Sequence, residues 1–141
     1  MIRRLTAMVA LGVLVLTASS AKADDQEKFQ GVWKADKAVE GGMETSANEV
    51  SKMSIEFKGN KAIPRRGGRT EKDAEFKLDS SKSPKTIDIK EQGSTTVLGI
   101  YEFDGDRLKI CFAKEGGERP TKFKSPEGSK ISYFVLKKQT K

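Results

Sequence analysis

The clearest structural pattern in the sequence is found in Val97-Leu98-Gly99-Ile100-Tyr101-Glu102-Phe103-Asp104-Gly105-Asp106-Arg107-Leu108-Lys109-Ile110-Cys111-Phe112. Two segments of alternating apolar residues flank Asp104-Gly105, and an Asp-Gly pair in this setting is a strong signal for a two-residue hairpin turn. A turn centred on this pair places Tyr101 opposite Leu108 and Gly99 opposite Ile110. Opposed residues share a face, so one apolar face collects Val97, Gly99, Tyr101, Leu108, Ile110 and Phe112. The stretch therefore predicts an antiparallel hairpin with this face inside a core.

The other face of the predicted hairpin is mixed. Its polar members are Glu102, Arg107 and Lys109, and its apolar members are Leu98, Ile100 and Cys111. Apolar residues on an outer face predict a partial cover, for which the short helix described below is the candidate. Cys111 is the only cysteine, so an internal disulfide is impossible. We expect a buried thiol, with a disulfide between two chains as the alternative.

The same period of two recurs along the chain in short runs separated by Gly, Pro, Asp and Ser clusters, which is typical of half-buried strands. The predicted strands are residues 31–39, 53–57, 61–63, 74–78, 86–89, 96–103, 107–113 and 131–137. Eight strands of this length predict a sandwich or a barrel. The capping-box spacing of Ser46 and Glu49 indicates one short helix over residues 47–52. In the last strand, either Tyr133 and Val135 or Phe134 and Leu136 face inward.

The N-terminal residues predict a cleavable secretory signal peptide. A positively charged start with Arg3 and Arg4 precedes a mostly apolar run of twelve residues, and an A-x-A site ends at Ala23. An uncleaved anchor is the alternative, but a spanning helix needs about 20 apolar residues. Cleavage after Ala23 would leave residues 24–141 as a single domain without a membrane span, located in the periplasm or outside the cell.

The processed chain is only mildly basic. Cleavage removes Arg3, Arg4 and Lys22, so the basic residues fall from 27 to 24 against 20 acidic ones, and the net charge falls from +7 to +4. This charge permits attraction to anionic polymers of the cell envelope. It is not the concentrated basic surface of a nucleic-acid-binding domain, so we expect no nucleic-acid partner.

The residue types on which most enzymes rely are absent or isolated. The chain contains no histidine, which removes the commonest general base and transition-metal ligand. The Asp104-Gly105-Asp106 run lacks the further oxygen ligands of a calcium loop. No pair of carboxylates stands out by its spacing. We therefore predict that the protein is not an enzyme, has no catalytic residues, and binds neither a metal nor another cofactor.

The opening of the first predicted strand, Gly31-Val32-Trp33, is similar to the G-x-W signature with which lipocalins begin their barrel. The wider pattern resembles an uncharacterised lipocalin-like domain family abundant in planctomycete-type bacteria. The similar segments are residues 30–33, 84–88, 98–102, 104–112 and 119–121. The resemblance implies an all-β, eight-stranded, mainly antiparallel lipocalin-like (calycin-type) barrel in which Gly31 and Trp33 close one end. Lipocalins stack a late Arg on this Trp, where the present chain offers Lys137 or Lys138. The family has no established biochemical function.

The expected interior supplies the candidate ligand-binding residues. The inward aromatic side chains either form an apolar pocket or fill the core, and an eight-stranded barrel permits both. Gly99 favours a pocket, because it removes a side chain from the middle of the inward face. Arg119 belongs to a loop that would lie near the barrel mouth if the strands follow sequence order. The candidate ligand-binding residues are Phe57, Phe76, Gly99, Tyr101, Phe112 and Arg119.

Three functions of different classes fit the sequence. The first is a carrier that binds a small hydrophobic molecule inside the barrel. The second is a protein-binding module, such as an inhibitor of an exported hydrolase. The third is an envelope-associated interaction domain that places Arg65, Arg66 and Arg69 on an anionic polymer. The carrier is our preferred interpretation.

Overall fold

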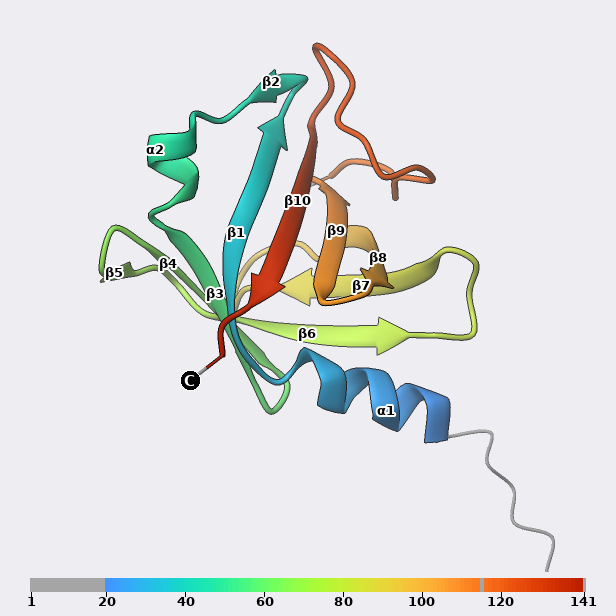
Figure 1. The fold of residues 1–141 in the computed structure, drawn as a ribbon. Helices are drawn as coiled ribbons and strands as arrows, with labels where there is room; N and C mark the ends of the chain where they lie inside the picture. Colours follow the sequence, from blue (N-terminus) through green and yellow to red (C-terminus); the bar gives the residue numbers. More distant parts are fainter. Residues whose placement is uncertain (1–19, 115, 141) are drawn as a thin grey trace, which may run out of the picture.

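A computed structural model describes residues 20–114 and 116–140 (Figure 1). Most of the predicted signal peptide, residues 1–19, lies outside the described residues. In chain order the elements are α1 (Ser20–Phe29), β1 (Gly31–Glu40), β2 (Met43–Glu44), α2 (Ala47–Val50), β3 (Met53–Lys58), β4 (Lys61–Arg66), β5 (Arg69–Thr70), β6 (Ala74–Asp79), β7 (Lys85–Lys90), β8 (Val97–Asp104), β9 (Arg107–Ala113) and β10 (Ile131–Lys138). No helix of this part of the chain has the length and apolar character needed to span a membrane.

The eight long strands form a closed antiparallel barrel. Their order is β1-β3-β4-β6-β7-β8-β9-β10, and β10 pairs with β1 to close the ring. The two-residue strands β2 and β5 extend the edges of β1 and β4. Each of the eight predicted strands is present, and the predicted lipocalin-like all-β barrel is confirmed. The prediction missed only β2 and β5, which are too short to show a period of two.

The central hairpin has the predicted faces but a different turn. The two turn residues are Gly105 and Asp106, and only Gly105 has positive φ, at 62°. Glycine in the first central position is the requirement of a type II′ turn. The partners are therefore Tyr101 with Ile110 and Gly99 with Phe112, two residues from the predicted register. A shift of two residues leaves every side chain on its predicted face, because the strand period is two.

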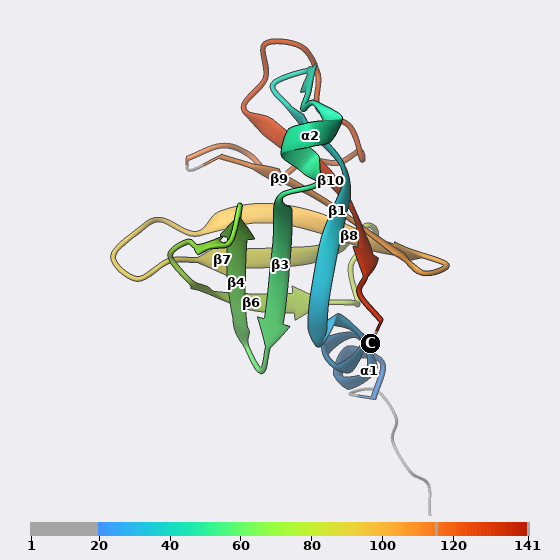
Figure 2. The same cartoon turned by 60° about the vertical axis from the view of Figure 1, so that its left-hand side comes forward.

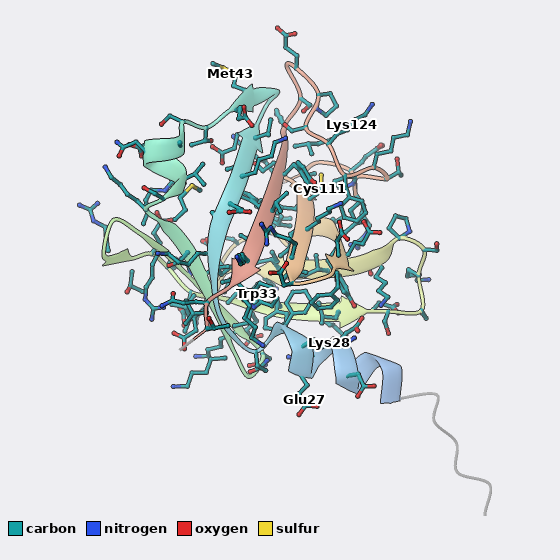
Figure 3. The ribbon with its side chains drawn as sticks, in the orientation of Figure 1. Glu27, Lys28, Trp33, Met43, Cys111 and Lys124 are labelled. Carbon is teal, nitrogen blue, oxygen red and sulfur yellow. The ribbon has the colours of Figure 1, made fainter. Side chains whose placement is uncertain are left out.

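The outer face of this hairpin is covered by the segment between β9 and β10. Cys111 is fully buried there, and its Sγ donates to the carbonyl of Lys124 at 3.4 Å. Figure 3 labels both residues, with Lys124 on the covering segment. The predicted cover by the short helix is wrong, because α2 contacts β1 instead. Burial raises the pKa of the Cys111 thiol, which keeps it protonated.

The predicted short helix exists, and its N-cap is the predicted one. Ser46 Oγ accepts a hydrogen bond from the backbone N–H of Glu49 at 3.3 Å, which satisfies a donor at the start of α2. A second helix, α1 at Ser20–Phe29, was not predicted from the sequence. This helix lies across one end of the barrel (Figures 1 and 2). It has no apolar stripe of helical period, since Phe29 is its only aromatic or large aliphatic residue.

Candidate functional site: an apolar cavity inside the barrel

The barrel encloses a cavity of about 580 Å³, within the size range of small-molecule sites. All eight long strands contribute to its apolar wall, and Phe57 and Ala62 lie at its deep end. The apolar lining residues are Ala35, Met53, Ile55, Phe57, Ala62, Pro64, Ala74, Ile89, Val97, Ile110, Phe112, Phe134 and Leu136. The sequence left open which side chains of β10 face inward. The lining shows that Phe134 and Leu136 do, so Tyr133 and Val135 face outward.

Buried aromatic side chains fill the end of the barrel below this cavity. Phe29, at the end of α1, is fully buried and has ring contacts with four aromatic side chains of the barrel. These are Phe57 at 4.9 Å, Tyr101 at 5.0 Å, Phe103 at 5.4 Å and Phe76 at 5.6 Å between ring centroids. Edge-to-face geometry predominates, as is favourable for aromatic pairs. This floor cluster (Phe29, Phe57, Phe76, Tyr101 and Phe103) lies between the cavity and the preceding turns of α1.

Polar contacts hold α1 in place over the floor cluster. The buried Asp25 carboxylate accepts from Tyr101 Oη at 2.6 Å and from Lys85 Nζ at 3.0 Å. Burial, and then the hydrogen bond to Asp25, raise the pKa of the Tyr101 hydroxyl far above its usual value. At the other side of α1, Gln26 Nε2 donates to the carbonyl of Gly59 at 2.7 Å. The N-terminal helix is therefore an integral part of the closed end.

The structure gives physical reasons for Gly31 and Trp33 at this closed end. Trp33 is buried, and its indole N–H donates to the carbonyl of Phe29 at 2.7 Å. The Lys138 ammonium lies 5.5 Å from the Trp33 ring centroid, within the range of a cation–π contact. Gly31 has a φ of 119°, which disfavours other residues, and a Cβ there would lie 3.1 Å from Lys138 Cε. Of the two lysines considered for the late Arg position, Lys138 contacts Trp33.

The mouth of the cavity opens where β4 separates from β6. These strands pair only at Lys61 with Glu75 and Ala62 with Ala74, after which β5 takes the free edge of β4. Pro64 lies in this separated part, where its missing N–H removes no bond to β6. Figure 2 shows the β4–β5 hairpin and the β7–β8 turn on the same side of the barrel. Both segments line the cavity, so the mouth lies between them.

Two of the six predicted ligand-binding residues, Phe57 and Phe112, line the cavity. Phe112 stacks on Phe134 of β10 at 5.6 Å between ring centroids. Phe76 and Tyr101 point inward but belong to the floor cluster, outside the lining. Their placement follows from α1, which brings Phe29 into their end of the barrel. The pattern of apolar residues gives no sign of this helix, because α1 has no apolar stripe of helical period.

The expectation that Gly99 leaves free space is wrong. A Cβ at this position would lie 2.8 Å from the Cys111 carbonyl oxygen, 2.9 Å from Phe112 Cβ and 3.2 Å from Ile87 Cγ2. The glycine is needed because the neighbouring strands approach closely at this point. It therefore contributes no room to the cavity.

A Gly99→Ala variant tests this close approach. The added methyl group would push against the backbone of β9, and we expect the free energy of unfolding to fall by about 1–3 kcal/mol. Urea denaturation followed by circular dichroism measures this difference. An unchanged midpoint would show that β8 and β9 can separate without cost.

Arg119 lies on the outer surface of the barrel and not at the mouth. Its guanidinium donates to the carbonyl of Gly99 at 2.7 Å and to the Asp88 carboxylate at 2.7 Å. These bonds attach the β9–β10 segment to β7 and β8. The structure therefore places Arg119 in contacts between segments, outside the cavity lining. Its sequence position between β9 and β10 could not show that this segment folds back over the hairpin.

The arginine cluster of the β4–β5 hairpin is divided between two faces. Arg65 forms an ion pair with Glu56 at 3.0 Å, and both belong to the outer face of their strands. Arg66 follows Ala62 and Pro64 on the inward face, and both Arg65 and Arg66 line the mouth. Arg69 is exposed.

Several residues that line the cavity were not predicted as ligand-binding residues, among them Ile55, Ile89 and Phe134. The available signal was the period of two: each lies two residues from another inward side chain of its strand. Among the described residues there is no cluster of three or more His, Cys, Asp or Glu side chains that could hold a metal ion. What the arrangement offers chemically is an apolar compartment with a charged rim.

The comparisons with known proteins add no family to this picture. No protein-family model, no curated protein and no solved structure matched the chain.

Proposed function

We propose that the protein binds one small, predominantly apolar molecule inside its barrel, and that it acts by binding and not by catalysis. The observation that carries this proposal is the cavity of about 580 Å³ with its continuous apolar wall. An eight-stranded barrel can be filled by its own side chains or can hold one small ligand. Here the floor cluster fills the closed end, and the volume near the mouth is left open.

Export is part of the proposal. Cleavage after Ala23 would leave Asp24 as the first residue and would preserve both Asp25 and Phe29, the residues of α1 that contact the barrel interior. The processed chain would therefore keep its closed end. Export would place the processed chain in the periplasm or outside the cell.

Native mass spectrometry of protein purified from the cell envelope tests both parts. We expect the mass of residues 24–141 plus one small molecule, which is released when the protein is denatured. A chain that retains residues 1–23 would contradict export. A ligand-free spectrum, together with no uptake of an apolar probe by the folded protein, would contradict the carrier function.

A matched pair of variants tests the place of binding. Ile89→Trp puts a large ring into the cavity, whereas Ile63→Trp adds the same ring at an outward position of β4 that does not line it. We expect Ile89→Trp to weaken binding of an apolar fluorescent probe by about tenfold or more, the equivalent of about 1.4 kcal/mol. Ile63→Trp should bind it as the wild type does. Equal affinities for the two variants would place the probe outside the barrel.

A further inference from the structure

Cations outnumber anions among the charged residues at the rim of the cavity. On β4 the inward residues Ala62 and Pro64 are followed by Arg66, the last residue of the strand. On β9 the inward Phe112 is followed by Lys114. Both cations are exposed at the surface and line the cavity. The apolar wall therefore ends in positive charge on two strands of the barrel.

The segment before β6 and the segment after β7 complete the rim. Lys72 precedes the inward Ala74, and its Nζ donates to the carbonyl of Gln92 at 3.3 Å, which joins the segment before β6 to the segment after the neighbouring strand β7. Glu91 follows the inward Ile89 and also lines the cavity. Of the six charged residues that line the cavity, four are cations (Arg65, Arg66, Lys72 and Lys114) and two are anions (Glu71 and Glu91).

The acidic residues near the rim leave these cations available. Arg66 Nε lies 3.9 Å from Glu71 Oε1, and both side chains are about half exposed, at 51% and 48%. An ion pair of this length and exposure contributes little and is easily replaced. The Glu56 carboxylate is directed to the outer face, where it pairs with Arg65. An anion at the mouth would therefore meet excess positive charge beside an apolar wall.

We propose that the ligand is a single-chain amphiphile with an anionic head group. Its hydrocarbon chain would lie along the apolar wall, and its head group would lie at the mouth against Arg66, Lys72 and Lys114. Hydrogen bonds between cationic donors and an anionic oxygen are stronger than those between neutral groups, which fixes the direction of entry. This inference rests on the proposed function and adds the chemical class of the ligand.

The experiment compares molecules that share one chain and differ in the head group. Decanoate and decanol are titrated into the folded, processed protein at low salt by isothermal titration calorimetry. We expect decanoate to bind about tenfold more tightly than decanol, and the difference to shrink as salt screens the rim. Decyl phosphate is titrated in parallel and separates a phosphate-headed ligand from a carboxylate-headed one.

Rim variants locate the head group. Lys72→Gln combined with Lys114→Gln should weaken decanoate binding about tenfold and leave decanol binding unchanged. Glu71→Gln should strengthen decanoate binding, because it removes the competing carboxylate beside Arg66. Lys58→Gln is the control, since Lys58 is an exposed lysine next to Gly59 at the closed end. It should change neither affinity.

The outcomes separate this inference from the proposed function. Equal affinities for decanoate and decanol, or loss of decanol binding in the double rim variant, would overturn the anionic head group and leave the carrier function standing. A neutral compound in the native mass spectrum would do the same. If the folded barrel takes up none of the probes and carries no ligand from the cell envelope, both proposals are wrong.

Discussion

Replacing Phe29 with alanine is expected to lower the free energy of unfolding by about 3–5 kcal/mol, the usual cost of truncating a buried aromatic side chain. Phe29 is fully buried and contacts four rings of the floor cluster. Its removal would leave a space that the surrounding strands cannot close, because they are joined by the ladders of the barrel. Urea denaturation followed by circular dichroism gives the difference.

Phe123→Ala is the matched control for Phe29→Ala. Phe123 lies half-buried in the segment between β9 and β10, away from the barrel interior. The same truncation there should cost less than half as much. Equal losses in the two variants would show that α1 is not part of the closed end. The result bears on function as well, since an opened floor would connect the apolar cavity to solvent at both ends.

The second large effect is a loss of stability at alkaline pH that depends on Tyr101. Burial and the bond to Asp25 raise the pKa of this hydroxyl in the folded state, whereas in the unfolded chain it titrates near its ordinary value of about 10. Above that pH the unfolded state releases a proton that the folded state retains. The stabilisation from protonated Tyr101 is therefore complete below about pH 10 and is lost as pH rises further, by up to about 1.4 kcal/mol per pH unit.

Tyr101→Phe isolates this contribution from other groups that titrate in the same range. At neutral pH the variant should be less stable than the wild type by about 1–3 kcal/mol, because the buried Asp25 carboxylate loses a hydrogen-bond donor. Unfolding free energies measured from about pH 9 to about pH 11 should then converge, since only the wild type has the Tyr101 proton to lose. Parallel curves for the two proteins would contradict the raised pKa.

The strands and their faces could be predicted because they depend on local patterns. The alternation of apolar and polar residues identified all eight long strands and placed Phe57, Phe76, Tyr101 and Phe112 on the inner side. The hairpin register was wrong by two residues, since Asp104-Gly105-Asp106 can form either of two tight turns. The predicted faces are nevertheless correct, because the two registers differ by two residues and side chains alternate between faces with a period of two. The Ser46 cap of α2 is local in the same way and was also predicted.

The candidate site was predicted only in part. Phe57 and Phe112 line the cavity, whereas Phe76 and Tyr101 pack around Phe29 beneath it. Whether an inward side chain fills the core or lines a cavity depends on its height along the barrel axis and on what enters from the ends. Neither quantity is contained in the pattern of one strand. The mouth likewise results from the separation of β4 and β6, which is a relation between strands.

The all-β chain of eight alternating strands follows from local sequence patterns, since hydrophobic period and turn chemistry act over a few residues. Three features of the site depend on tertiary contacts instead. Phe29 is inserted between the strands, Arg119 lies across the outside of β8, and the backbone of β9 comes so close to Gly99 that no space remains there. Each is a contact between segments far apart in the chain or on different strands. Such contacts form because a closed barrel must bury its open ends and exposed apolar faces, and local patterns do not specify which segment will do so.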